Sequence, residues 1–262
     1  MALSPDNNSP LPLMLAGDTS TGYCTVALCS CDTQSGHCIP LSTMTLDSKR
    51  LHSERLLGAV QWVLDEAGVA FEDLSCLAMT TGPGSFTGLR VGLAFWKGLA
   101  LALQQPLISV PTLDALTRLN AFPEGTLIPL LDARMKEVFG AVYRFESGIR
   151  TKVTEDQAAS VEFFIAEALK EKGPYLFLGN GAQKYREAIL SAGREVFIAP
   201  LHCGLPRAEA VAAEALELWM QNPDHDPASA VPRYHRLSQA EQARSQREAS
   251  EADASASESG SS

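Results

Sequence analysis

Two aspartates and two glycine-containing turns are the residues whose types and spacing most suggest chemistry. Asp18 and Asp132 each end a short apolar run, and the turns Gly82-Pro83-Gly84 and Gly179-Asn180-Gly181 follow two later apolar runs. A glycine turn between a strand and a helix exposes backbone N–H groups and a helix N-terminus, which suit an anion or a phosphate. Most such turns are only connections. The pattern therefore gives a hypothesis of nucleotide-facing loops, formed by Asp18, Thr19, Ser20, Asp132, Gly179 and Gly181.

No catalytic or metal-binding residue is expected. Ser85 follows a glycine, but a nucleophile elbow needs Gly-x-Ser-x-Gly, and two residues separate Ser85 from Gly88, so Ser85 is better interpreted as a helix N-cap. The five histidines include no pair at ligand spacing, and the six cysteines include no Cys-x-x-Cys pair. Cys29 and Cys31 lie two apart on an expected strand, which favours a reduced, packed role on one face.

A pattern of elements that occurs twice positions these residues. Each half has three strand-like segments, a helix, a buried strand and a second helix, which predicts an α/β protein with two related lobes and a cleft between them. In the first half the expected strands are 13–17, 23–31, 39–46 and 74–81, with helices over 49–67 and 85–103. In the second half they are 127–131, 137–145, 149–154 and 175–178, with helices over 160–171 and 182–192 and a final helix over 206–220.

The composition narrows the class of protein. With 262 residues, 21 Lys plus Arg and 31 Asp plus Glu, the formal charge is −10, which disfavours the wrapping of nucleic acid by this chain alone. The proline-rich segment 1–12 and the Ser/Ala/Glu-rich segment 238–262 are expected to be disordered. No targeting signal is recognised at the N-terminus and no apolar run is long enough to span a bilayer. We therefore expect a cytoplasmic protein without membrane contact.

The stretch 81–93, Thr-Gly-Pro-Gly-Ser-Phe-Thr-Gly-Leu-Arg-Val-Gly-Leu, is the most distinctive in the chain. It closely resembles the TsaB family, also called YeaZ. Further similar motifs are Leu-Ala-Gly-Asp-Thr-Ser at 15–20, His-Ser-Glu-Arg-Leu-Leu at 52–57, Val-Pro-Thr-Leu at 110–113, Leu-Asp-Ala-Arg at 131–134, Glu-Val-Phe at 137–139 and Val-Pro-Arg-Tyr-His-Arg at 231–236. The resemblance covers residues 13–237. It implies a two-lobed actin-like (ASKHA) fold of duplicated β-β-β-α-β-α type, with subdomains at 13–108 and 109–237 and the final helix packed back on the first.

The resemblance implies a non-catalytic subunit required for N6-threonylcarbamoyladenosine (t6A) modification of tRNA, at the adenosine 3′ of the anticodon. The implied partners are the transferase TsaD and the ATPase TsaE, with a homodimer when the chain is alone and only indirect contact with tRNA. The related transferase carries two metal-binding histidines at positions that here hold Thr112 and Leu116. No metal or other cofactor is therefore expected to be required, and ATP or ADP would bind only at a junction between subunits.

Two helices of the first half supply the expected docking surface. The helix over 85–103 is apolar almost all round, whereas a single apolar stripe suffices to cover a sheet. The alternative is that these side chains only line the core. The expected contacts with TsaD are Leu56, Val60, Val63, Phe86, Leu89, Leu93 and Trp96.

An enzyme of its own is the alternative function, either a stand-alone actin-like ATPase or a glycoprotease-type metallopeptidase. Against the ATPase, the turn after Asp18 lacks the glycine that lets phosphate approach closely in nucleotide-hydrolysing relatives. Against the peptidase, the two histidine positions are changed.

Overall fold

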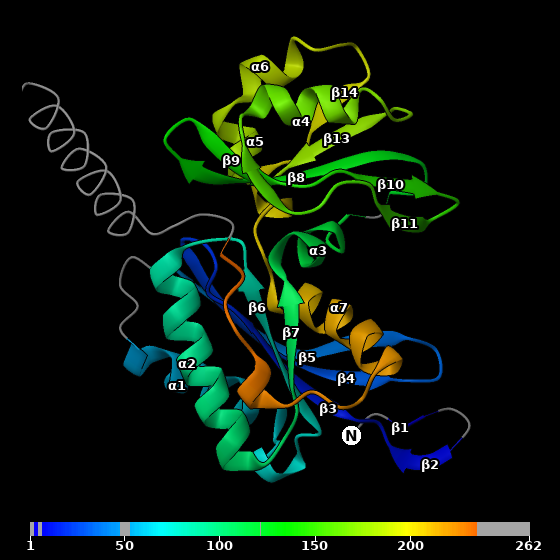
Figure 1. The fold of residues 1–262 in the computed structure, drawn as a ribbon. Coiled ribbons are helices and arrows are strands. Elements are labelled where there is room, and N and C mark those ends of the chain that lie inside the picture. The colour runs from blue at the N-terminus through cyan, green and yellow to red at the C-terminus, as the bar shows by residue number, and fades with distance from the viewer. Residues whose placement is uncertain (1–2, 5–6, 48–52, 121, 235–262) are drawn as a thin grey trace, which may run out of the picture.

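The computed structural model describes residues 3–4, 7–47, 53–120 and 122–234, which form two lobes (Figure 1). The chain leaves the first lobe after α3 (Thr112–Thr117) and returns to it with α7 (Ala208–Gln221). The other elements of the first lobe are β3 (Leu13–Asp18), β4 (Tyr23–Asp32), β5 (His37–Asp47), α1 (Ser53–Ala67), the 3₁₀ helix η2 (Phe71–Asp73), β6 (Cys76–Gly82), α2 (Phe86–Leu103) and β7 (Leu107–Pro111).

The first sheet has the strand order β5-β4-β3-β6-β7. β5, β4 and β3 form an antiparallel meander, while β6 and β7 run parallel to β3. β3 and β6 are buried along their whole length, as expected for continuous apolar strands covered by helices on both faces. β5 is an edge strand and is partly exposed along its length.

The second lobe repeats this order. Its elements are β8 (Gly125–Arg134), β9 (Glu137–Gly140), β10 (Tyr143–Glu146), β11 (Ile149–Lys152), β12 (Gln157–Ala159), α4 (Val161–Ala168), β13 (Tyr175–Leu178), α5 (Asn180–Lys184), α6 (Arg186–Leu190), β14 (Val196–Ile198) and the 3₁₀ helix η3 (Leu201–Cys203). Its main path is β11-β10-β8-β13-β14, with β10 antiparallel to β8 and β13 parallel to it. The predicted two-lobed α/β fold with duplicated subdomains is confirmed by this shared order.

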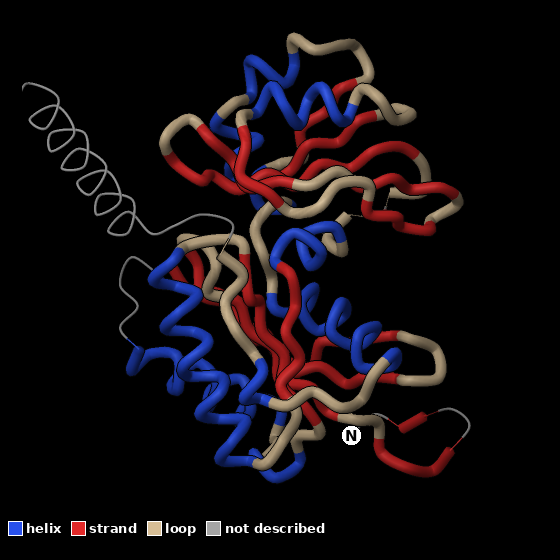
Figure 2. The backbone as a smooth tube through the Cα atoms, viewed as in Figure 1, coloured by secondary structure: helices blue, strands red, loops and turns tan. Residues whose placement is uncertain are grey.

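Helices cover both faces of the first sheet (Figure 2). On one face Val60 of α1 and Trp96 of α2 pack with Leu77 of β6 in a single apolar cluster. On the other face Val211 of α7 packs with Ile108 of β7. The final helix thus belongs to the core of the first lobe, although every element of the second lobe precedes it in the sequence.

α2 is, within the described residues, the one helix long and apolar enough to cross a membrane by length and composition alone. Its Leu89, Leu93, Trp96 and Ala100 are buried, and all but Leu89 pack in the cluster that also contains α1. These buried side chains indicate that one side of α2 packs on the core of the first lobe.

Several expected elements differ from the observed ones. The short strands β7, β12 and β14 were not predicted, because runs of three to five residues at a sheet edge carry little periodicity. The expected strand 137–145 is two strands, β9 and β10, and the expected helix 182–192 is split between α5 and α6 at Tyr185.

Within the segment 1–12, which is expected to be disordered, the structure pairs β1 (Leu3–Ser4) with β2 (Asn7–Pro10). The expected helical residues 49–52 and the tail 238–262 lie outside the described residues.

Candidate functional site

Asp18 ends β3 and is buried beneath the turn that follows it. Thr80 Oγ1 donates a hydrogen bond to Asp18 Oδ1 at 2.5 Å, and Ser20 N donates to the same oxygen at 3.2 Å. The second oxygen, Oδ2, has no hydrogen-bond partner among the described residues. Burial raises the pKa of Asp18 by more than these hydrogen bonds lower it. Because a metal ligand must be ionised, this setting weakens Asp18 as a ligand for a cation.

Close packing of α2 against the turn after β3 explains the glycines of the stretch 81–93. A Cβ at Gly92 would lie 2.1 Å from Thr19 Oγ1, and a Cβ at Gly88 would lie 2.1 Å from Thr19 O. The Thr19 hydroxyl donates to Gly88 O at 2.8 Å, and Ser85 N donates to Ser20 O at 2.6 Å. Gly88 and Gly92 thus allow a close approach to α2, and the approaching group is this chain's own turn. Thr19 and Ser20 are therefore buried under α2.

Ser85 is the N-cap of α2, as predicted. Its backbone is extended, and its hydroxyl accepts a hydrogen bond from Gly88 N at 3.3 Å. The cap leaves the hydroxyl engaged with the first turn of the helix.

The expected loop residues of the second lobe also lie together. Asp132 Oδ1 accepts from Lys184 Nζ at 2.8 Å, and Asn180 Oδ1 accepts from Asp132 N at 2.9 Å. A Cβ at Gly179 would lie 2.1 Å from Leu130 O, so glycine is required for α5 to pack on β8. The structure thus brings Asp132, Gly179 and Gly181 together in one lobe, and Asp18, Thr19 and Ser20 together in the other.

Thr112 and Leu116 lie on α3 and are fully buried. Leu116 packs with Leu113 and Leu131 in an apolar cluster of the second lobe. Within the described ranges, no three His, Cys, Asp or Glu side chains are grouped as a metal ion would require.

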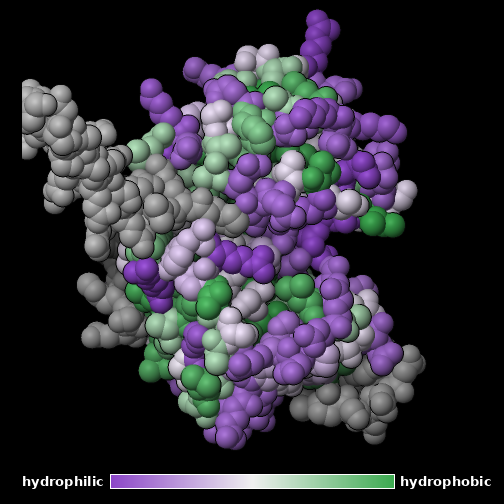
Figure 3. All heavy atoms as spheres, viewed as in Figure 1, coloured by the Kyte–Doolittle hydropathy of each residue, from purple (hydrophilic) through white to green (hydrophobic). Residues whose placement is uncertain are grey.

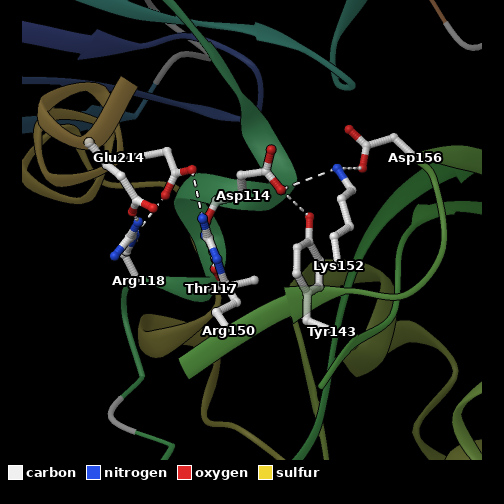
Figure 4. A network of polar contacts seen from close by, with 9 residues as sticks. Asp114, Thr117, Arg118, Tyr143, Arg150, Lys152, Asp156 and Glu214 are labelled. Carbon is white, nitrogen blue, oxygen red and sulfur yellow. Dashed lines mark hydrogen bonds and ion pairs between the residues drawn. The ribbon is translucent and has the colours of Figure 1, made fainter. Parts of the chain in front are cut away.

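A network of polar side chains joins the lobes at the crossing of the chain (Figure 4). Asp114 of α3 accepts from the Tyr143 hydroxyl at 2.5 Å and from Lys152 Nζ at 3.1 Å. Lys152 also pairs with Asp156, at 2.6 Å. Burial, followed by the charge of Asp114, raises the pKa of Tyr143 well above its ordinary value. Tyr143 therefore remains a hydroxyl donor at neutral pH.

Glu214 of α7 is the centre of the other half of this network. It accepts from Arg118 Nε at 2.6 Å and from Arg150 Nη2 at 2.8 Å. Arg150 of β11 also donates to Thr117 Oγ1 at 2.7 Å and to Asp114 O at 3.0 Å. Burial alone would raise the pKa of Glu214, but Arg150 and Arg118 outweigh burial and lower it. The network ties α7 of the first lobe to β11 of the second.

Sequence reasoning missed this network, although one signal was present. Glu214 stands on the buried side of α7 near Val211 and Ala215, where a charge requires a partner. Its partners Arg150 and Arg118 are 64 and 96 positions away. No local pattern could have named them.

The expected docking residues must be corrected. Phe86 is half-buried, and the other six pack in the core, so they cover this chain's own sheet rather than offer a surface. They are Leu56, Val60, Val63, Leu89, Leu93 and Trp96.

Other apolar side chains lie on the outer sides of the same two helices. On α1, Leu57 is 52% and Trp62 43% exposed, and on α2, Val91 is 40% and Leu101 59% exposed. In Figure 3 apolar side chains gather at the lower left, over α2.

The C-terminal segment of the described chain lies along α2. Lys97 Nζ donates to Ala228 O at 2.9 Å and to Ala230 O at 3.1 Å, near the 3₁₀ helix η4 (Pro227–Ser229). Arg90 Nε donates to the Tyr234 hydroxyl at 2.8 Å, and the Tyr234 ring packs on Phe86 with centroids 5.1 Å apart. The polar edge of α2 is thus occupied by this segment, which leaves the stripe of Val91 and Leu101 uncovered by the described residues.

Comparison with known proteins agrees with this fold. The family model TsaD, tRNA N6-adenosine threonylcarbamoyltransferase, matches residues 44–244. The tRNA threonylcarbamoyladenosine biosynthesis protein TsaB of Bacillus subtilis is 33% identical over 195 residues, 74% of this chain and 83% of that protein. TsaB of Escherichia coli is 34% identical over 175 residues, 66% of this chain and 73% of that protein.

Solved structures give the same result. YeaZ from Pseudomonas aeruginosa superposes with a TM-score of 0.68 at 29% identity, covering 86% of this chain and 100% of that chain. A second structure from that organism, described as an uncharacterized protein with similarity to peptidase YEAZ, superposes with a TM-score of 0.70 at 30% identity, with the same coverage. Agreement in sequence over 83% and 73% of two TsaB proteins, and in structure with YeaZ, shows that this chain belongs to the TsaB (YeaZ) family.

Proposed function

We propose that this chain is a non-catalytic subunit of the machinery that makes t6A in tRNA, and that it binds and stabilises the transferase TsaD through the outer sides of α1 and α2. The B. subtilis and E. coli relatives are named as t6A biosynthesis proteins, which supports the pathway. The transferase family model matches most of this chain, so the two proteins share a fold. Related folds can pair through equivalent faces, as two copies do in a symmetric dimer.

The exposed stripe of α2 is the observation that carries this proposal. Positions 91, 94, 98 and 101 recur at helical spacing and are all exposed, with the small residues Ala94 and Gly98 between Val91 and Leu101. Small residues allow a second helix to approach closely, and large apolar residues on either side provide buried area. Leu57 and Trp62 of α1 are exposed apolar side chains as well.

The geometry of the two loops supports a role without bond chemistry. The turn after β3 packs against α2, burial raises the pKa of the Asp18 carboxyl, and Thr112 and Leu116 stand where the resemblance implies histidines in the transferase. We expect ATP or ADP only at a junction between subunits, and TsaE to join the assembly during turnover. Contact with tRNA is indirect, in keeping with the charge of −10, and the location is cytoplasmic. A homodimer through the same face is expected when TsaD is absent.

Val91→Glu and Leu101→Glu test the interface. Each variant places a charge in the exposed stripe, so the stability of the chain is expected to change by less than about 0.5 kcal/mol. A charge buried without a partner in the complex costs about 2–3 kcal/mol, which corresponds to roughly a 30- to 140-fold weaker Kd for TsaD. Titration of labelled TsaD measures the Kd, and light scattering measures the mass of the complex.

Ile149→Glu is the matched control, because Ile149 is an exposed apolar residue of the second lobe. It should leave the Kd unchanged. Wild-type affinity in both α2 variants would show that TsaD binds elsewhere. Val60→Glu and Leu93→Glu are unsuitable, since both side chains are buried and a charge there tests folding instead. ATP turnover or threonylcarbamoyl transfer by the purified chain alone would contradict the non-catalytic role.

A further inference from the structure

Three cysteines meet at the end of the β4–β5 hairpin. Cys31 and Cys38 are direct partners in the strand register, and their Sγ atoms lie 3.1 Å apart. Cys29, two residues before Cys31 on the same face of β4, also hydrogen-bonds to the Cys38 thiol. All three are free thiols in this structure.

The backbone around Cys31 and Cys38 suits a disulfide. Direct partners on antiparallel strands have Cα atoms about 4.5–5.5 Å apart, within the range of about 4.4–6.8 Å that disulfides span. An S–S bond is about 2.05 Å long, so small rotations of two side chains close the remaining gap. Neither strand has to move.

The other cysteines are poorly placed for this reaction. Met14 of β3 pairs with Cys29 on one side and with Cys76 on the other, so Cys76 lies two strands away, about 9–10 Å. Cys24 packs in the core on the opposite face of the sheet. Cys203 belongs to the second lobe.

Cys38 is the natural point of attack on an oxidant. It is half-buried, beside the exposed hairpin turn, whereas Cys29 and Cys31 are fully buried. A Cys38 thiolate accepts hydrogen bonds from the thiols of Cys29 and Cys31, which lowers its pKa. The pKa values of Cys29 and Cys31 are raised, because they donate to Cys38 and because they are buried. The thiolate, which is the nucleophile, therefore forms first at the most accessible sulfur.

We propose that Cys31 and Cys38 form a peroxide-sensitive dithiol, a site of reversible oxidation separate from the proposed docking face. Cys38 Sγ attacks one oxygen of hydrogen peroxide, the O–O bond breaks, and Cys38 sulfenic acid and one water result. Cys31 Sγ then attacks Cys38 Sγ, the S–O bond breaks, and a second water leaves as the S–S bond forms. Two thiols are oxidised while one peroxide is reduced to two waters, and a dithiol reductant reverses the reaction.

Oxidation of this pair joins the edge strand β5 to β4 beneath α7. Cys29 and Cys31 belong to the apolar cluster in which Val211 and Ala215 of α7 pack. A disulfide between these two cysteines reduces the conformational entropy of the unfolded chain. The oxidised chain is therefore expected to have a higher Tm than the reduced chain.

The test uses the full chain, reduced and then treated with hydrogen peroxide under native conditions. The treated chain should lose two thiols reactive to maleimide in denaturant, and a dithiol reductant should restore them. Trypsin cannot separate these cysteines, because residues 1–48 contain no Lys or Arg. A protease that cleaves before aspartate cuts at Asp32 and so separates Cys38 from Cys29 and Cys31. The expected product is the fragment ending at Cys31 joined to the fragment that contains Cys38.

Variants identify the sulfurs. Cys38→Ser should slow peroxide consumption about tenfold or more, because the attacking thiolate is gone. In Cys31→Ser, oxidation should stop at a Cys38 sulfenic acid or form a disulfide between Cys29 and Cys38. Mass spectrometry distinguishes both products from the expected one. Cys203→Ser, far from the hairpin, should behave as wild type. The proposal is overturned if thiol loss needs denaturant, if Cys38→Ser oxidises at the wild-type rate, or if the link joins Cys203 or a second chain.

Discussion

Replacing Glu214 with glutamine tests the junction of the lobes most directly. Glu214→Gln keeps the shape of the side chain, so no cavity forms, but it removes the charge that two guanidinium groups share at 2.6 and 2.8 Å. Loss of one partner of a buried ion pair costs about 3–5 kcal/mol. Arg118 is partly exposed, and Arg150 keeps Thr117 and the carbonyl oxygen of Asp114 as acceptors. We therefore expect a loss of about 2–3 kcal/mol in the free energy of unfolding.

That loss should lower the Tm by about 5–10 °C for a chain of this size. Urea unfolding followed by circular dichroism gives the free energy directly, and the slope with urea should be unchanged. Glu167→Gln is the control, because Glu167 pairs at the surface with Lys170, whose side chain is mostly exposed. Such a pair contributes about 0–1 kcal/mol.

The pH dependence adds a second check on Glu214. Its pKa in the folded chain is lowered, so its contribution is fully present above the pKa of the unfolded chain and disappears as the pH falls through the folded value. The difference between wild type and Glu214→Gln should thus be constant near neutral pH and shrink in acid. A loss below about 1 kcal/mol, or a difference that does not change with pH, would refute the argument that this carboxylate holds the lobes together.

Two further predictions concern the turn after β3. Gly92→Ala should destabilise the chain by about 2 kcal/mol or more, because the new Cβ would collide with Thr19 Oγ1. Gly98→Ala, with open space around its Cβ, should instead stabilise α2 by about 0.5–1 kcal/mol. Equal changes of Tm in the two variants would contradict this packing. The free energy of unfolding of Asp18→Asn, relative to that of the wild type, should be higher at pH 7 than at pH 4. The pKa of Asp18 is raised in the folded chain, so ionisation of this buried carboxyl destabilises the wild type as the pH rises. A difference that stays the same across this range in urea titrations would show that Asp18 is not buried in a desolvated site.

The fold was largely predictable because its central strands and main helices have strong periodic signals. β3 and β6 are continuous apolar runs, and α1 and α2 carry apolar stripes at helical spacing. The close approach at Gly88 and Gly92 could also be foreseen, since glycine inside a helix is unfavourable without such a reason. The group that approaches, the turn after Asp18, could not be identified before the fold was known.

The docking face shows where sequence reasoning stops. Periodicity finds the apolar stripe of a helix, but a helix with apolar residues on several sides gives no indication of which side the sheet covers. The sheet covers the side of Val60, Leu93 and Trp96. The smaller exposed stripe of Val91 and Leu101 is recognisable only once that side is buried.

The return of α7 to the first lobe has a consequence for synthesis of the chain. One face of the first sheet, with Met14, Ala27 and Ile108, is covered by residues that follow the entire second lobe in the sequence. A ribosome releases the N-terminus first, so the sheet of the first lobe emerges long before the helix that covers it. The lobe that begins folding first is therefore completed last, and its apolar face stays open to chaperones, or to other nascent chains, until residue 221 has emerged.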